Sequence, residues 1–514
     1  MTKLDKATEL LNKGADYYQA GQFDKAVKYY QEAAELGNVI AMSNLGYCYY
    51  YGRSIPKDYK MAEKYFSMAA EHDDANALYK LGDMHANGII DKDMSVAMDY
   101  YQRAYKIALK DKNAFNYPDI CMRLAKLAKD KEPQKAKDFL DEAISGFTAR
   151  IFCYNDHFTD KLLLSAFELR NELDGKPSYL SIIAKAKDKT GYLPRGFRLP
   201  DPFVLDGKAF PDGMTDGAFL FHIEKDTVDD KTLTSILRNI AKYKYREATT
   251  ALLELFKDYF ALGIIDDARD KILENPKEYD SNAFYLYAVK GILGGTDKEI
   301  VKFCLGLLSL FDEPAIGILH NAIETLALND EFTLFCIVGN IEKWQGGNKK
   351  VFELAKHLTG WGRIHAISHL EPETAEIQEW LLADGIHNDI SPAYSALDCY
   401  KKCGLDKRLP NPMSEKEFKG AGAIVGGLLD DETAPGISEI EKPTNMLFDY
   451  LNKANTMAIC VEDFYHVLQI RNYTKSPKLR DECKALLKSE KCAAAVKASP
   501  GDDLAVQLAK EIGK

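Results

Sequence analysis

The segment Ala41-Met42-Ser43-Asn44-Leu45-Gly46-Tyr47 decides the fold of the first third of this 514-residue chain. A related segment, Ala77-Leu78-Tyr79-Lys80-Leu81-Gly82, begins 36 residues later. In each segment a glycine lies among apolar residues spaced to share one face of a helix. A period of about 35 residues that is rich in small side chains is typical of stacked helix hairpins.

Small residues keep the same register over three copies of this period. The glycines are 32 and 36 residues apart, at Gly14, Gly46 and Gly82. Two alanine series follow at intervals of 36 and 35, namely Ala26, Ala62 and Ala97, then Ala33, Ala69 and Ala104, with Tyr30, Phe66 and Tyr101 between them. Because close helix crossings admit only small side chains, we expect Gly14 to pack against Ala26, and each aromatic to fill the space toward the next repeat. A second glycine series should end each first helix in a left-handed cap, at Gly21, Gly52 and Gly88.

These spacings resemble the tetratricopeptide superfamily, and more narrowly its Sel1-like branch. Two stretches carry the closer match: residues 41–47 with Gly52 and Lys57-Asp58-Tyr59, and residues 77–82 with Gly88. The link between the two helices is longer there than in a plain tetratricopeptide repeat, whereas the first copy, residues 21–26, has the short link. A weaker fourth copy places Ala136, Leu140 and Ala143 at the same internal spacing. The resemblance covers about residues 4–150.

Helical patterns continue through the rest of the chain without this repeat. Residues 194–211 hold four prolines and two glycines and predict a loop or domain junction. Beyond residue 226 the pattern predicts helices over 227–243, 247–262, 297–311, 314–328 and 374–383. Such helix pairs resemble HEAT-like stacks, although an irregular bundle has the same signature. We therefore expect an all-α fold, an α-solenoid of antiparallel helix pairs, divided into a Sel1-like domain (1–150), a connector (151–225) and a HEAT-like domain (226–514).

Composition limits the class of partner. Acidic residues exceed basic ones, 78 against 67, which gives a net charge of −11 and argues against nucleic acid as a partner. The longest apolar runs are about half the length that a membrane span needs, so no membrane association is expected. Ten scattered cysteines indicate buried thiols in a reducing compartment, and the N-terminal residues lack a signal-peptide pattern. We expect a cytoplasmic protein.

The resemblance implies that a protein or peptide partner binds on a concave face lined by the first helices. The register places seven residues at its outward positions: Tyr18, Ser43, Tyr47, Tyr50, Tyr79, Asp83 and Asn87. Tyrosine suits this role because it buries a large ring and keeps a hydroxyl for orientation. Packing between repeats is the alternative for some of these tyrosines. Nothing in the pattern indicates an oligomeric state.

Three patterns in the second half suggest chemistry and a fourth, the three tryptophans, suggests anchors for a partner, but each has a simpler structural interpretation. His365 and His369 share the i, i+4 spacing of zinc ligands but lack the glutamate of HExxH. Cys399 and Cys403 have the same spacing and could be zinc ligands. The segment 420–427 holds four glycines, as a dinucleotide-binding loop does, but not in the GxGxxG order. The three tryptophans, Trp344, Trp361 and Trp380, lie near one another in sequence. Packing explains all four, so we expect no metal, no cofactor and no catalytic residue.

The sequence therefore favours a protein–protein interaction scaffold without enzymatic activity. The alternative is a helical-repeat enzyme or nucleic-acid-binding protein of the HEAT-like DNA glycosylase type. That alternative requires a basic channel and a carboxylate beside aromatic side chains.

Overall fold

The computed structural model describes residues 2–110, 115–154, 159–223, 228–312 and 317–512. The chain forms two compact units, Met1–Pro177 and Ser178–Lys514, and each is described by itself. The regular secondary structure of the described residues is helical, apart from two strands of two residues each. The expected all-α architecture is confirmed.

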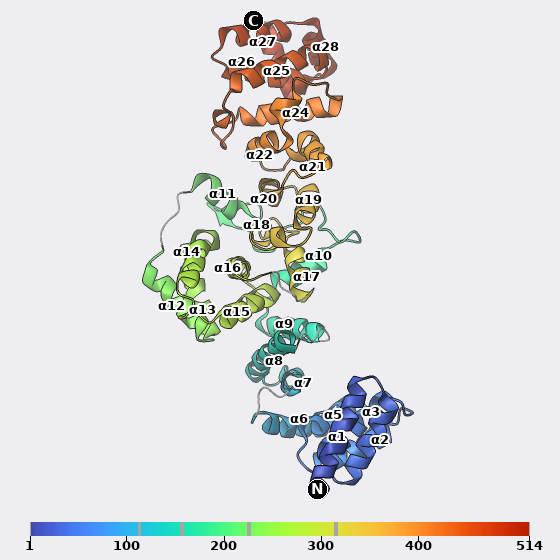
Figure 1. Ribbon diagram of the computed structural model, residues 1–514. Helices are drawn as coiled ribbons and strands as arrows, with labels where there is room; N and C mark the ends of the chain where they lie inside the picture. The colour runs from blue at the N-terminus through green and yellow to red at the C-terminus, as the bar shows by residue number, and fades with distance from the viewer. Residues whose placement is uncertain (1, 111–114, 155–158, 224–227, 313–316, 513–514) are drawn as a thin grey trace. The chain divides into compact units, whose positions relative to one another are not determined.

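The first unit is a series of antiparallel helix hairpins (Figure 1). Consecutive helices pack as pairs, and each pair packs against the next. The helices are α1 (Lys3–Gln19), α2 (Phe23–Glu35), α3 (Val39–Tyr51), α4 (Tyr59–Ala70), α5 (Ala75–Ala86), α6 (Met94–Ala108), α7 (Tyr117–Ala128), α8 (Pro133–Tyr154) and α9 (Asp160–Asp174).

The ends of these helices follow the polar and glycine residues of the repeat. Asn38 and Asp74 cap the first helices α3 and α5, because each side chain accepts a hydrogen bond from the third backbone N–H of its helix. The glycines expected to end the first helices, Gly21, Gly52 and Gly88, have φ of 73°, 70° and 66°. In this region a side chain would be strained, so the prediction of left-handed glycines is confirmed.

The first periodic glycine approaches Ala26 as expected, since a Cβ at Gly14 would lie 3.4 Å from the Ala26 carbonyl oxygen, and the periodic glycines also make a closer contact with an aromatic ring. A Cβ at Gly14 would lie 2.7 Å from ring atoms of Tyr30, and a Cβ at Gly82 would lie 2.6 Å from the ring of Tyr101. The expectation that each aromatic side chain fills the space toward the next repeat stays a prediction, and the ring also packs on the glycine of its own hairpin. The physical reason is that a ring on the second helix needs a flat surface opposite it, which only a missing side chain provides.

The second unit is a longer array of shorter helices. The pairs α15 with α16, α19 with α20, α22 with α24 and α26 with α27 are among those that pack together. The elements are α10 (Tyr179–Ala186), β1 (Val204–Leu205), β2 (Lys208–Ala209), α11 (Met214–His222), α12 (Asp230–Ala241), α13 (Tyr245–Leu255), α14 (Ala261–Glu274), α15 (Ser281–Gly294), α16 (Lys298–Leu308), α17 (Gly317–Leu326), α18 (Thr333–Ile337), η2 (Ile341–Lys343), α19 (Gly347–His357), α20 (Trp361–His369), α21 (Ala375–Trp380), η3 (Leu381–Gly385), α22 (Ala393–Cys403), α23 (Leu405–Arg408), α24 (Glu415–Leu428), η4 (Ile437–Glu439), α25 (Pro443–Met457), α26 (Val461–Tyr473), α27 (Pro477–Leu487), α28 (Glu490–Ala498) and α29 (Asp503–Ile512).

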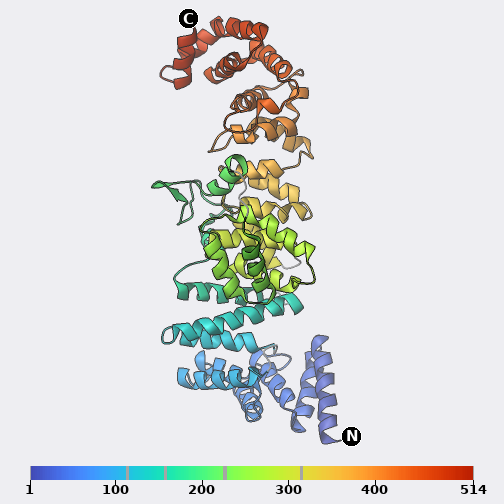
Figure 2. The same ribbon diagram turned by 90° about the vertical axis from the view of Figure 1, so that its left-hand side faces the viewer.

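The proline-rich segment at residues 194–211 is a loop, as predicted, and it carries the antiparallel hairpin of β1 and β2. Asp206 and Gly207 form its turn with φ of 50° and 75°. Both strands are exposed and stand clear of the neighbouring helices (Figure 2).

Two predicted helices are interrupted. The helix expected over 247–262 ends at Leu255, and α14 begins at Ala261, whose backbone N–H donates to the carboxylate of Glu299 at 2.7 Å. That cap comes from α16, so the local pattern does not contain it. The helix expected over 374–383 changes after Trp380 into the π-helical turn η3. The HEAT-like assignment and the boundaries at residues 150 and 225 stay predictions.

Within the described ranges, no helix combines the length and the apolar character required to cross a lipid bilayer.

Candidate functional site

Tyrosine side chains from α3 and α5 surround the ammonium group of Lys80. Its Nζ lies 5.6, 5.5, 5.8 and 5.0 Å from the ring centroids of Tyr47, Tyr50, Tyr51 and Tyr79, respectively. The Tyr47 hydroxyl donates a hydrogen bond to that of Tyr79 at 2.9 Å and so joins the second hairpin to the third. Ring faces attract a cation, so Lys80 fixes the four rings in place. We call these four tyrosines the tyrosine cluster.

Asp83 anchors this cluster to the next hairpin. It pairs with Lys80 at 3.3 Å and accepts hydrogen bonds from Arg123 Nη2 at 2.9 Å and from the Tyr101 hydroxyl at 2.8 Å. Arg123 also pairs with Asp119 one turn earlier on α7, at 3.6 Å. The contacts of this one carboxylate therefore extend from α5 to α6 and α7.

The charges of this network are held in a dry environment. The side chains of Lys80 and Asp83 are each 9% exposed. Burial alone would raise the pKa of the Asp83 carboxyl, but the hydrogen bond and charge of Arg123, with the charge of Lys80, offset it and hold the pKa below its ordinary value. Asp83 thus stays ionised at neutral pH.

The seven expected site residues divide into three groups by exposure. Tyr18 and Asn87 are exposed, and Tyr47 and Tyr50 are half-buried; Ser43, Tyr79 and Asp83 are buried. The cluster brings Tyr47, Tyr50 and Tyr79 together with Asp83 close by. Tyr18 instead packs on Phe23 in the first hairpin, with ring centroids 4.9 Å apart. Partner contact by any of the seven stays a prediction.

Three participants were missing from the expected set, namely Tyr51, Lys80 and Arg123. Tyr51 is 51% exposed and is the most accessible ring of the cluster. The i, i+3 spacing of Lys80 and Asp83 was a signal for an ion pair on one helix face. Arg123 gave no signal, because it lies 40 residues from Asp83 in sequence.

Of the two histidines in the second unit, His365 lies in the core and His369 lies at its margin. Burial lowers the pKa of His365 to about 3, and this ring lies near Trp361. His369 Nδ1 is 3.5 Å from Glu342. In the part of the chain that the structure describes, no group of three or more His, Cys, Asp or Glu side chains is placed to hold a metal ion.

The glycine-rich segment and the cysteines pack in the second unit. Residues 420–427 lie inside α24, where a Cβ at Gly420 would come 1.9 Å from the carbonyl oxygen of Leu382. Cys399 and Cys403 are buried, and burial raises the pKa of the Cys403 thiol to about 12. Trp344 and Trp361 are buried as well.

Each of the first three hairpins coincides with one copy of a known repeat. Residues 6–38, 39–74 and 75–106 match the Sel1 repeat family. Residues 6–106 are Sel1 repeats.

The chain is similar to known proteins in sequence and in structure. Over 82 residues the chain is 34% identical to the ERAD-associated E3 ubiquitin-protein ligase component HRD3B of Arabidopsis thaliana, and this stretch spans 16% of the chain and 14% of that protein. A Sel1 repeat protein from Oxalobacter formigenes is similar in structure over 35% of this chain and 76% of that chain, with 21% identity and a TM-score of 0.25. The protective antigen c5321 of uropathogenic Escherichia coli strains, which displays an SLR fold, is similar over 84% of this chain and 85% of that one, with 14% identity and a TM-score of 0.26.

Proposed function

We propose that the chain is an interaction scaffold that holds a protein or peptide partner on the tyrosine cluster of its Sel1 repeats. The observation that carries the proposal is the fixing of four tyrosine rings around Lys80 while one of them, Tyr51, remains half exposed. Rigid tyrosines bind with little loss of conformational entropy and supply both apolar area and a hydroxyl. In this proposal Tyr47, Tyr50 and Tyr51 contact the partner, and Tyr79 and Asp83 support them.

The proposed binding role gives a reason for the buried charged residues beneath the tyrosine cluster. Lys80, Asp83 and Arg123 are costly to bury, and a packed apolar core would be as stable without them. Their contacts fix the position of aromatic rings on two successive hairpins. A preorganised surface loses less free energy on binding than a mobile one.

The proposed role is binding and not catalysis. A net charge of −11 argues against the alternative of a glycosylase-type nucleic-acid enzyme. That alternative predicts strong, salt-sensitive binding of duplex DNA by the full chain.

The test compares the wild-type chain with one double variant of the tyrosine cluster and with a matched tyrosine control. Proteins retained from a native lysate by the wild-type chain should be lost by the Tyr50→Ala, Tyr51→Ala double variant. They should still be retained by Tyr100→Ala, because Tyr100 lies on the second helix α6 and stacks on His85. The dissociation constant of a retained protein, once purified, should rise by at least about tenfold in the double variant. Equal retention by the double variant would refute the assignment of this surface.

A further inference from the structure

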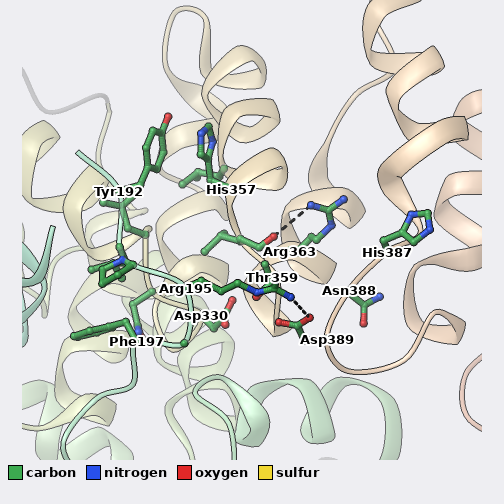
Figure 3. A pocket seen from close by; sticks show the side chains of 17 residues that line it. Tyr192, Arg195, Phe197, Asp330, His357, Thr359, Arg363, His387, Asn388 and Asp389 are labelled. Carbon is green, nitrogen blue, oxygen red and sulfur yellow. Dashed lines mark hydrogen bonds and ion pairs between the residues drawn. The ribbon is translucent and has the colours of Figure 1, made fainter. Parts of the chain in front are cut away.

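The second unit contains a pocket of 430 Å³ that belongs to none of the features discussed so far (Figure 3). Its walls come from the loop 192–197, the turn 328–330, the end of α19 with residues 357–359, and the loop 387–389. In Figure 3 the side chain of Arg195 extends past Asp330 toward Asp389. The volume lies within the range of small-molecule sites and exceeds that of a single side chain.

Asp330 is a half-buried carboxylate of this pocket, and one of its two oxygens accepts a hydrogen bond. Its Oδ1 accepts a hydrogen bond from the backbone N–H of Gly362 at 2.8 Å and so caps α20. Two glycines make this approach possible, since a Cβ at Gly360 or Gly362 would lie 2.4 or 2.6 Å from the Asp330 oxygens. Among the described residues, no hydrogen bond or ion pair reaches Oδ2. Burial, opposed by the Gly362 hydrogen bond, raises the pKa of Asp330 to about 7.

The two arginines of the pocket wall have different partners. Arg363 Nη1 donates to the carbonyl oxygens of Ala355 and Leu358, and Nη2 donates to that of Asp384. The guanidinium of Arg363 therefore caps the carbonyl oxygens at the carboxyl end of α19 and in the turn η3. Arg195, whose side chain is 85% exposed, lies 3.8 Å from Asp389.

Aromatic side chains form another part of the wall. Tyr192 stacks on His357 with ring centroids 3.5 Å apart, and Phe197 lines the same pocket. His357 Nδ1 donates to the backbone oxygen of Glu353 at 2.8 Å, so this ring is held in a fixed orientation. Rings beside a carboxylate suit an alkyl stem that ends in a positive charge.

We propose that this pocket binds a cationic group, a guanidinium or a primary ammonium on an alkyl stem, with Asp330 as its counter-ion. An anion would meet the free oxygen of Asp330 and the carboxylate of Asp389, whereas the buried arginine of the wall, Arg363, is already bound to three carbonyl oxygens. A cation would supply the missing donor to Asp330 and a second partner to Asp389. The proposal concerns the second unit alone and does not depend on the tyrosine cluster.

Arg195 competes for the same place. Among the described residues, its guanidinium is the cation paired with Asp389, and its side chain is exposed, so that it can move out of the pocket. Arg195→Ala should therefore strengthen binding of a cationic ligand by removing this competitor.

The probes are agmatine, which is a free guanidinium on an alkylamine, and acetyl-arginine methylamide, which presents the same group on a peptide unit. Acetyl-glutamate methylamide is the anionic control. Isothermal titration of the full chain should detect saturable binding of at least one cationic probe below about 10 mM, and none of the anionic one. Tighter binding of agmatine indicates a free amine as the ligand, and tighter binding of the arginine derivative indicates a side chain of a polypeptide.

The decisive variant is Asp330→Asn, which keeps an acceptor for the Gly362 N–H and removes the charge. It should weaken cation binding by at least about tenfold, while Glu376→Gln, at an exposed position on α21, should leave it unchanged. Circular dichroism verifies that both variants are folded. Equal binding of the cationic probe by a folded Asp330→Asn variant would overturn the proposal. If that variant does not fold, the titration of the wild-type chain decides. A lack of saturable cation binding by the wild-type chain, or its preference for the anionic probe, would also overturn the proposal.

Discussion

The ring of Phe66 lies against the α-carbon of Gly46, so that a Cβ at this glycine would come within 2.5 Å of the ring atoms Cδ1 and Cε1. The two residues belong to the two helices of one hairpin, α3 and α4. The same relationship recurs in the first and third hairpins, where a tyrosine takes the place of phenylalanine. The Sel1 period is therefore a period of ring-on-glycine contacts.

Gly46→Ala should destabilise the first unit by about 1–3 kcal/mol, because Phe66 is fully buried and its ring cannot move away without disturbing its neighbours. Urea denaturation followed by circular dichroism measures this change. Gly317→Ala is the control, since no atom of the described residues lies within 4 Å of the position of its Cβ.

A double variant tests the cause of that loss. Adding Phe66→Leu to Gly46→Ala should recover part of the stability, because a narrower side chain leaves room for the new methyl group. Additive losses in the two single variants would show that the ring and the glycine are not coupled.

The first third of the fold was predictable because its signal is local. Glycines and alanines recur within one hairpin, and capping residues such as Asn38 and Asp74 stand directly before their helices. The spacing predicted that Gly14 approaches Ala26, but it did not predict that the ring of Tyr30, on the same opposite helix, lies closer still. In the second unit the start of α14 depends on a carboxylate 38 residues away, which no local pattern contains.

Asp83→Asn should destabilise the first unit by about 3–5 kcal/mol at pH 7, because it leaves Lys80 and Arg123 without their shared counter-ion. The folded-state pKa of Asp83 lies below its ordinary value of 3.8, so its stabilisation is complete above that value and is lost as the pH falls through the folded pKa. The difference in unfolding free energy between wild type and variant should therefore shrink below about pH 4. A constant difference from pH 7 to pH 3 would contradict the role given to this carboxylate.

Lys302→Met should destabilise the second unit by about 3–5 kcal/mol, because the ammonium of Lys302 is fully buried among Asp216, Glu299 and Glu331 at 2.8, 2.9 and 2.6 Å. Without it, the three carboxylates would repel one another in the core. Thermal unfolding at pH 7 measures the loss. Lys298→Met is the matched control and should cost less, because its ammonium is 3.8 and 4.0 Å from its nearest carboxylates.

The candidate surface was predictable only in part, because local spacing along the helices predicts which residues share a face. Helical register places Tyr47, Tyr50 and Tyr79 on neighbouring first helices, which predicts that they gather. Register does not predict how deeply each residue is buried, because Asp83 owes its burial to Arg123 on another hairpin. The pocket of the second unit depends on segments almost 200 residues apart in sequence, and the sequence pattern gave no indication of it.

Asp330→Asn should remove a pH dependence of stability that the wild-type chain has between about pH 4 and pH 8. The folded-state pKa of Asp330 is raised to about 7 by burial, with Asp212 and Asp389 adding to the rise and Gly362 N–H and Arg198 opposing it. Because the folded state holds this proton more tightly than the unfolded state, the contribution of Asp330 is complete below its ordinary value of 3.8 and is lost as the pH rises through 7. The slope contributed by one such group is at most about 1.4 kcal/mol per pH unit. Urea denaturation of both proteins at pH 5 and pH 8 measures it, since carboxyls common to both cancel in the difference. A variant whose stability falls as steeply as that of the wild type would show that Asp330 ionises freely in the folded chain.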